Sequence, residues 1–244
     1  MKVVLFCGGM GTRLKEFSET IPKPMVDVGG TPIIMHLMKY YAHFGHKDFI
    51  LCLGYGEKYI KRYFLSYDEC LENDFTYVQS GRRIEVCGTT IADWTITFVN
   101  TGMTASIGQR LRAVRRYIGS DDVFMANYAD GLSDLDLADY EGFFRRHGRT
   151  ASFVSVRPHQ SFHYVVAGDD GVVQAVHPIG LGDIFLNGGF FIFRRQVFDY
   201  IQEGEDLVEE PFQRMIRDGE LVTYRHRGVH PGSGARQHDR GRMP

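Results

Sequence analysis

The feature that most constrains the fold of this chain is the alternation of short apolar runs with helical patterns over its first half. Near-continuous apolar runs, typical of strands buried on both faces, lie at residues 2–7, 49–53, 95–99 and 123–126. Between them, apolar residues repeat at helical spacing. The first such segment begins with Pro32 at its first helical position and ends at Gly45, and others follow at residues 59–64 and 107–118. This alternation predicts a parallel α/β sheet.

The second half is less regular. Its patterns predict further helices and strands at residues 137–144, 151–156, 197–201, 209–216 and 221–224. Two short apolar runs flank a Gly-Asp-Asp-Gly turn at residues 168–171, which predicts a β-hairpin, and Gly188-Gly189 interrupts a strand-like run at 185–193. We therefore predict a Rossmann-like α/β fold. Its sheet is mixed, mostly parallel and flanked by helices, with a small β-hairpin lobe, in one domain over residues 1–225.

Composition and charge exclude several classes of protein. No apolar run in the 244 residues approaches the roughly 18–20 residues that a membrane-spanning helix needs. The net charge of −2 provides no basic surface for nucleic acid. The first apolar run meets Gly8-Gly9 too early to form a signal peptide, and the four cysteines contain no Cys-x-x-Cys pair. We expect reduced thiols in a cytoplasmic protein, without membrane or nucleic-acid partners.

The end of the chain differs in composition from the rest. Residues 226–244 are rich in Arg, His, Gly and Pro, and their apolar side chains are Val229, Ala235 and Met243. Such a segment cannot bury an apolar face, so we expect residues 226–244 to be disordered. The same composition is also compatible with a non-native or out-of-frame end.

The first predicted strand ends in a Gly-Gly-x-Gly-Thr-Arg-Leu motif, which a Pro-Lys-Pro motif follows. Glycines allow backbone N–H groups to face phosphate oxygens, and a hydroxyl can donate to them. The candidate nucleotide-binding residues of this loop are Gly8, Gly9, Gly11 and Thr12. Arg13 can neutralise a polyphosphate, and Lys23 is held between two prolines that restrict its backbone. A glycine-rich loop alone could be a turn, but the two motifs together indicate an anion site.

With these motifs the sequence resembles the sugar-1-phosphate nucleotidylyltransferases, and within them the glucose-1-phosphate cytidylyltransferase branch. The resemblance covers roughly residues 1–225. It rests on Pro22-Lys23-Pro24-Met25-Val26, Gly29-x-x-Pro32-Ile33, residues 49–55, Thr101-Gly102, Gly108-x-Arg110-Leu111, Asp130-Gly131-x-x-Asp134 and Asn187-Gly188-Gly189-Phe190-Phe191. It implies the nucleotide-diphospho-sugar transferase fold, a homo-oligomer, and transfer of a nucleotidyl group from a nucleoside triphosphate to a sugar 1-phosphate. CTP and glucose 1-phosphate are the favoured substrates, with release of pyrophosphate.

The resemblance also implies roles for individual residues. Arg13 would stabilise charge on the transferred phosphoryl group, and Lys23 would contact the sugar phosphate or the α-phosphate. Asp130 would be a Mg²⁺ ligand and Arg110 would lie near the base. The substrate-binding residues against the sugar would be Asn187, Gly188 and Gly189. Taken alone, Asp130-Gly131 could be only a turn, and the Asn-Gly-Gly segment only a strand bulge.

The chain departs from the family pattern at several positions. Residues 107–111 read Ile-Gly-Gln-Arg-Leu where the cytidylyl branch has Thr-Gly-Gly-Arg-Leu, and Ala129 replaces a common glycine. His177-Pro178 stands where Glu-Lys-Pro is common. Residues 228–231 read Gly-Val-His-Pro where the family has Gly-Phe-Trp followed by a second metal aspartate. Two alternatives therefore stay open: another base or sugar, such as dTTP, and a nucleotide-binding subunit with weak Mg²⁺ binding and poor turnover.

Overall fold

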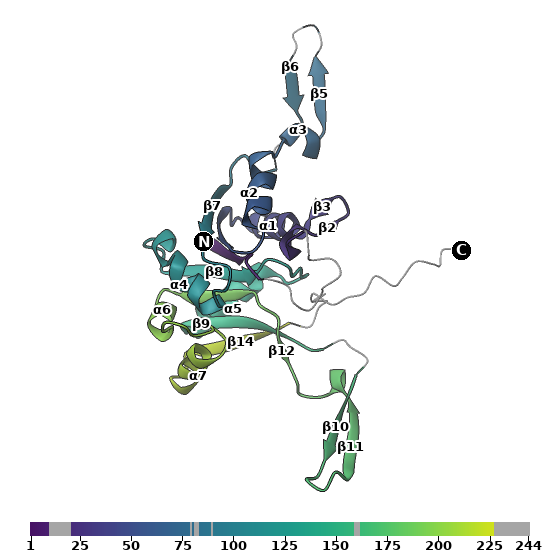
Figure 1. The fold of residues 1–244 in the computed structure, drawn as a ribbon, viewed down its shortest axis with the longest axis vertical. Coiled ribbons are helices and arrows are strands. Elements are labelled where there is room, and N and C mark those ends of the chain that lie inside the picture. Colours follow the sequence, from purple (N-terminus) through teal and green to yellow (C-terminus); the bar gives the residue numbers. More distant parts are fainter. Residues whose placement is uncertain (10–20, 79, 81–82, 89, 159–161, 227–244) are drawn as a thin grey trace, which may run out of the picture.

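The centre of the molecule is a mixed β-sheet (Figure 1). The computed structural model describes residues 1–9, 21–78, 80, 83–88, 90–158 and 162–226. Within these residues the sheet is eight-stranded, in the order β9-β13-β8-β1-β4-β7, with β12 and β14 also paired to β9. The strands are β1 (Lys2–Phe6), β4 (Asp48–Leu53), β7 (Thr95–Asn100), β8 (Val123–Tyr128), β9 (Ala151–Val156), β12 (Leu186–Asn187), β13 (Phe191–Arg194) and β14 (Leu221–His226).

Most strand pairs of this sheet are parallel. β1 pairs in parallel with β4 and with β8, β4 with β7, and β9 with β14, whereas β12 and β13 are antiparallel to their neighbours. The prediction of a mixed, mostly parallel sheet is therefore confirmed. Because β1, β4, β7 and β8 run in one direction, their carboxyl ends lie at a single edge of the sheet, where open α/β sheets usually bind ligands.

Helices cover both faces of the sheet (Figure 1). They are α1 (Ile33–His43), α2 (Glu57–Leu65), α3 (Glu69–Glu72), α4 (Ile107–Ile118), α5 (Leu137–His147), α6 (Val197–Tyr200) and α7 (Glu210–Arg217). Alternate side chains of β1 pack on the two faces of the sheet, since successive side chains of a strand point in opposite directions. Val3 and Leu5 pack with residues of α1 and α5, and Val4 and Phe6 with residues of α4, α6 and α7. Each such buried side chain contributes about 1.5–3 kcal/mol of transfer free energy.

The boundaries of α1 illustrate how the sequence sets them. Gly45 lies beyond its carboxyl end in the left-handed region, with φ of +85°, and donates its N–H to the Ala42 carbonyl at 2.9 Å. Pro32 precedes the helix in extended conformation, with ψ of 144°, so the expected first helical position is wrong by one residue. Among the described residues, no helix has the length and apolar character needed to cross a bilayer.

All four cysteines are free, as expected from the sequence. Cys7 and Cys52 are buried, and burial raises the pKa of the Cys7 thiol and that of Cys52, the latter to about 12. A thiol with so high a pKa stays protonated at neutral pH and is unreactive. These two cysteines therefore serve as small apolar side chains of the core.

Two hairpins project from the central body in opposite directions (Figure 1). β10 (His163–Ala167) and β11 (Val173–Pro178) form the predicted β-hairpin lobe, which η2 (Ile179–Leu181) follows. The second projecting hairpin consists of β5 (Phe75–Val78) and β6 (Arg83–Val86), and the sequence patterns did not predict it. A smaller hairpin of β2 (Asp27–Val28) and β3 (Thr31–Pro32) turns at Gly29-Gly30, both at positive φ.

The strand-like run at 185–193 is interrupted at Gly188-Gly189, as predicted. Asn187 lies opposite Ser155 and Ile192 opposite Ser152, so five residue steps along this segment span three steps along β9. Hydrogen bonds with Val154 continue across the interruption, with Gly188 N–H donating to its carbonyl at 2.8 Å. The segment is therefore one irregular strand with a bulge between β12 and β13.

Candidate active site

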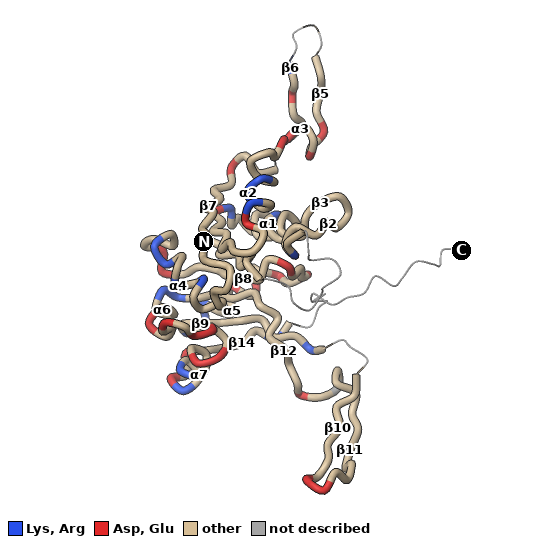
Figure 2. The backbone as a smooth tube through the Cα atoms, viewed as in Figure 1, with Lys and Arg blue, Asp and Glu red and all other residues tan. Residues whose placement is uncertain are grey.

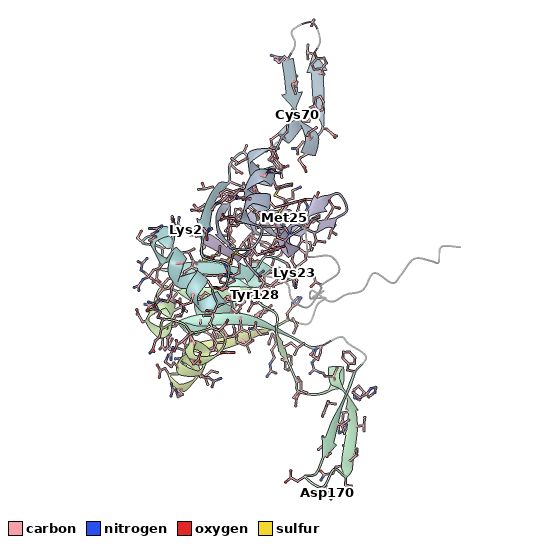
Figure 3. The ribbon with its side chains drawn as sticks, in the orientation of Figure 1. Lys2, Lys23, Met25, Cys70, Tyr128 and Asp170 are labelled. Atoms are coloured by element: carbon pink, nitrogen blue, oxygen red, sulfur yellow. The ribbon has the colours of Figure 1, made fainter. Side chains whose placement is uncertain are left out.

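A cleft of about 350 Å³ opens at the carboxyl ends of β1 and β8, beside the amino end of α4. Several residues that the sequence analysis singled out line this cleft: Gly8, Gly9, Lys23, Arg110 and Asp130. Figure 3 shows Lys23 and Tyr128, which also lines it, close together at the centre of the molecule. A larger open depression of about 850 Å³ lies near α6 and α7, and it contains none of the predicted site residues. The geometry therefore favours the smaller cleft.

Three residues of the glycine-rich loop, Gly11, Thr12 and Arg13, lie outside the described residues. Their roles in nucleotide binding and in stabilising the transferred phosphoryl group stay predictions. Gly9 is exposed, and nothing lies within 4 Å of the position that a Cβ would occupy there.

Arg110 forms the floor of the cleft through backbone contacts. Its guanidinium donates to the carbonyls of Leu53 (3.2 Å), Gly8 (3.0 Å) and Met103 (3.3 Å), and to Thr101 Oγ1 (2.7 Å). These acceptors lie at or beyond the carboxyl ends of β1, β4 and β7. Arg110 therefore joins the loops that follow three strands and also lines the cleft, and its expected place near the base stays a prediction.

The guanidinium of Arg110 is a buried charge without a carboxylate partner among the described residues. Only 2% of this residue is exposed, and burial lowers its pKa, although a guanidinium remains charged in proteins. A Cβ at Gly8 would lie 2.1 Å from Arg110 Nη1, and one at Gly54 2.9 Å from the same atom. Gly8 is thus required by the side chain beneath it, a reason that the motif alone does not reveal.

Lys23 begins the short 3₁₀ helix η1 (Lys23–Met25). Pro22 precedes it in extended conformation, and Met25 N–H donates to the Pro22 carbonyl at 2.8 Å. Lys23 therefore lies in a tight backbone turn between Pro22 and Pro24. Lys23 is half-buried and forms no ion pair with any described residue, so its ammonium can bind an anion.

Asp130 follows β8, is half-buried and lines the same cleft as Gly8 and Gly9. It forms no ion pair with a described residue. A second carboxylate, that of Asp206, also lines the cleft. Burial raises the pKa of Tyr128 to about 12, and the charges of Asp206 and Asp130 add to this effect, which indicates that both carboxylates lie near its hydroxyl.

Comparison with known proteins identifies the family of this chain. The model of the family described as nucleotidyl transferase matches residues 2–229. The chain belongs to the nucleotidyl transferase family. It is 36% identical over 230 residues to a probable glucose-1-phosphate cytidylyltransferase of Bacillus subtilis (strain 168), covering 93% of this chain and 89% of that protein. It is 37% identical, with the same coverage, to the glucose-1-phosphate cytidylyltransferase of Salmonella typhi.

Solved structures of other proteins share the fold. The UTP-bound UGPase from Acinetobacter baumannii superposes with a TM-score of 0.68 at 19% identity, over 94% of this chain and 87% of that one. HddC from Yersinia pseudotuberculosis gives a TM-score of 0.66 at 20% identity, over 94% and 92%. The expected nucleotide-diphospho-sugar transferase fold is therefore confirmed.

The side chains that line this cleft are compatible with a divalent cation. No group of three or more His, Cys, Asp or Glu side chains that could hold a metal occurs in the described part of the chain. Mg²⁺, however, keeps several waters and is usually bound by one or two carboxylates together with substrate phosphates. Asp130, half-buried and free of ion pairs with described residues, meets that requirement once a triphosphate is bound.

Asn187, Gly188 and Gly189 form the bulge between β12 and β13 and do not line the 350 Å³ cleft. Asn187 Oδ1 accepts the N–H of Gly189 at 2.9 Å, and a Cβ at Gly189 would lie 2.7 Å from Asn127 Oδ1. The conformation of the bulge therefore explains why these residues are present. This is the alternative to sugar binding that the sequence left open. Their contact with a sugar stays a prediction.

The sequence analysis missed Ser106, Tyr128 and Asp206 as cleft residues. Ser106 could have been found from the sequence, because a serine directly before a helical pattern is typical of an N-cap. In the structure its Oγ accepts the Gln109 N–H at 3.3 Å, as expected of that position. Asp206 carries no such signal, since it lies in the connection between α6 and α7, far along the chain from every motif of the cleft.

Proposed function

We propose that this nucleotidyltransferase transfers a cytidylyl group from CTP to glucose 1-phosphate, giving CDP-glucose and pyrophosphate. The observation that carries the proposal is the gathering of Gly8, Lys23 and Asp130 in one cleft of a chain 36–37% identical to glucose-1-phosphate cytidylyltransferases. The overall identity supports the choice of base and sugar, and the cleft supports the chemistry.

The residues of the cleft suit an in-line displacement at the α-phosphorus. A phosphate oxygen of glucose 1-phosphate forms the new P–O bond, and the bond from the α-phosphorus to the leaving pyrophosphate breaks. Lys23 and the Gly8–Gly9 backbone would neutralise and orient the phosphates, while Arg110 adds a buried positive charge beneath them. Arg13 would add a further cation. Such transfers depend on positioning and charge neutralisation more than on acid–base groups.

Asp130 would hold Mg²⁺, our proposed cofactor, together with phosphate oxygens of the nucleotide. The bound ion would supply charge neutralisation on the phosphoryl oxygens. Asp206 lines the same cleft.

The first experiment measures pyrophosphate release with α-glucose 1-phosphate, Mg²⁺ and each of CTP, dTTP, UTP, GTP and ATP. We expect CTP to give the highest kcat/KM. A higher value with dTTP or another nucleotide would replace the cytidylyl assignment by that base, the alternative left open by the departure at residues 107–111.

The Asp130→Asn variant tests the proposed metal ligand. We expect kcat to fall about 100-fold or more, because the loss of a metal ligand weakens several kcal/mol of charge stabilisation. Asp169→Asn is the matched control, since Asp169 is exposed in the turn of the β10–β11 hairpin. Thermal melting of both variants should match the unsubstituted protein. Equal activity of Asp130→Asn and the control would exclude Asp130 as the ligand.

The departure at residues 228–231, which lie outside the described residues, still predicts weak Mg²⁺ binding and poor turnover. The same assay, run over a range of Mg²⁺ concentrations, decides this point. Saturation at submillimolar Mg²⁺ with ordinary turnover would remove the alternative of an impaired nucleotide-binding subunit.

We also propose that the protein is cytoplasmic and forms a homo-oligomer. We further propose that residues 1–225 form one domain and that the remaining residues form a separate tail. Exposed apolar side chains on the projecting hairpins support assembly, among them Phe75, Tyr77, Val165, Val173 and Val176.

A further inference from the structure

The two terminal nitrogens of Arg110 bond to different parts of the molecule. Nη1 donates to the Leu53 carbonyl at 3.2 Å and to Thr101 Oγ1 at 2.7 Å. Nη2 donates to the carbonyls of Gly8 at 3.0 Å and Met103 at 3.3 Å. Leu53 is the last residue of β4 and is fully buried, whereas Gly8 and Met103 both line the cleft. One nitrogen is therefore anchored at the sheet, and the other holds two loops of the cleft.

The anchor of Nη1 has a fixed direction. The N–H and the Oγ1 of Thr101 both donate to the Leu53 carbonyl, at 2.9 and 2.8 Å. A hydroxyl has a single proton, so with that proton on Leu53 only the lone pairs of Oγ1 are left for Arg110. The sheet thus determines where the acceptors of Nη1 lie, and through them the plane of the guanidinium.

The hydrogen bond from Arg110 to Gly8 also orients the next N–H of the glycine-rich loop. No described peptide bond is cis, and in a trans peptide the carbonyl of one residue and the N–H of the next point in opposite directions. Because the Gly8 carbonyl is directed at Arg110, the Gly9 N–H is directed away from it. Gly8 is buried, whereas Gly9 is exposed and lines the cleft. No described residue accepts the Gly9 N–H, which leaves it available to an anion.

We propose that Arg110 is a positioning residue for phosphate binding. By holding the Gly8 carbonyl, it directs the Gly9 N–H towards a phosphate oxygen of the nucleoside triphosphate. This inference rests on the proposed binding of a triphosphate in the cleft, but it requires no particular base. The role needs the planar fork of arginine in addition to its charge, because the compact ammonium of lysine cannot span both pairs of acceptors.

The first test compares variants that keep the positive charge at residue 110. Arg110→Lys loses the fork, and Thr101→Val loses one acceptor of Nη1 at nearly constant side-chain volume. Dissociation constants of CTP, UTP and dTTP are measured by calorimetry with Mg²⁺ and without sugar phosphate, so they do not depend on turnover. We expect the affinity for every triphosphate to fall by the same factor, about 10-fold in Arg110→Lys and about 3-fold in Thr101→Val.

Two exposed residues provide matched controls outside the cleft. Arg112→Lys makes the same exchange on α4, and Thr95→Val makes it at the opposite end of β7 from Thr101. Both controls should keep the affinities of the unsubstituted protein. Combining Arg110→Lys with Thr101→Val should weaken binding by less than the product of the single effects, because both changes disturb one network.

The second test observes the Gly9 N–H directly. In protein labelled with ¹⁵N-glycine, the Gly9 amide signal is assigned by its loss in Gly9→Ala. Saturation of the unsubstituted protein with CTP and Mg²⁺ should move this signal downfield, as a hydrogen bond to phosphate does. In Arg110→Lys, also at saturation, we expect a smaller shift. A merely structural role of Arg110 would lower the melting temperature and leave this shift unchanged.

Unchanged affinities in both Arg110→Lys and Thr101→Val would overturn the inference, because the charge alone would then suffice. A changed ratio of CTP to UTP affinity would overturn it as well, since Arg110 would then act on the base. So would a Gly9 signal that CTP does not move in the unsubstituted protein. Tighter binding of UTP or dTTP than of CTP by that protein would contradict the proposed function and leave the role of Arg110 intact.

Discussion

Arg110 and the glycines around it show how one side chain determines its neighbours. Its guanidinium fills the space where Gly8 and Gly54 would carry side chains, and it satisfies carbonyls that follow three different strands. A buried charge without a carboxylate partner is costly unless it is fully hydrogen-bonded. We infer that the cost is tolerated because a bound triphosphate would supply the missing negative charge.

Gly8→Ala is expected to destabilise the protein through Arg110. A Cβ 2.1 Å from Nη1 must displace the guanidinium, and overpacking of this kind costs about 2 kcal/mol. The melting temperature should fall by roughly 4–8 °C. Gly9→Ala is the matched control, because its Cβ would meet nothing within 4 Å. Equal melting temperatures for the two variants would show that Arg110 moves aside without cost.

At the scale of elements, the sequence predicted those with a buried face. β9 was expected at residues 151–156 and occupies Ala151–Val156, because its apolar run is buried in the sheet. The β5–β6 hairpin was missed, since its strands are exposed and β6 carries Arg83 and Glu85. The same limit applies to the site. Local motifs reveal Lys23 and Asp130, whereas Asp206 reaches the cleft only through the packing of α6 and α7.

His46 connects two elements and makes their packing sensitive to pH. It follows α1, and its Nε2 lies 2.5 Å from Glu141 Oε1 on α5. Burial lowers the pKa of His46, with Glu141 acting in the opposite direction and the amino terminus and Arg145 acting with burial. In the folded protein, His46 therefore becomes protonated at a lower pH than in the unfolded chain, where its pKa is about 6.5.

We expect the free energy of unfolding to decrease as the pH falls through about 6.5 and to be unaffected by His46 titration above that range. Urea unfolding followed between about pH 8 and pH 5.5 measures it. His46→Gln should show a shallower decrease, because glutamine does not titrate. An equally steep decrease in this variant would assign the pH dependence to other groups.

At the scale of the whole molecule, the β10–β11 hairpin exposes apolar surface at a distance from the core. Figure 2 shows charged residues at its tip, and its strands carry no Lys, Arg, Asp or Glu. Val165 and Val176 are opposite each other in the hairpin and are 56% and 55% exposed. Such a surface is typical of contacts between protein molecules.

We predict that the protein elutes as a multiple of 27.8 kDa in size-exclusion chromatography with light scattering. Replacing both Val165 and Val176 by Glu should shift it to 27.8 kDa, because the buried apolar contact would be lost. Asp169→Asn, at the tip, should leave the mass unchanged. An unsubstituted protein that elutes at the monomer mass would contradict assembly through this hairpin.

The position of β13 has a consequence for how the chain folds during synthesis. β13 lies between β8 and β9, although it is made after both of them. Until residues 191–194 have left the ribosome, the edges of β8 and β9 that β13 will pair with are unpaired. The two strands cannot be joined into one sheet before then. Nascent chains stalled before this point therefore carry one open edge at β8 and two at β9, whose other neighbour β14 is made later still, and we expect them to depend on chaperones more than chains stalled after it.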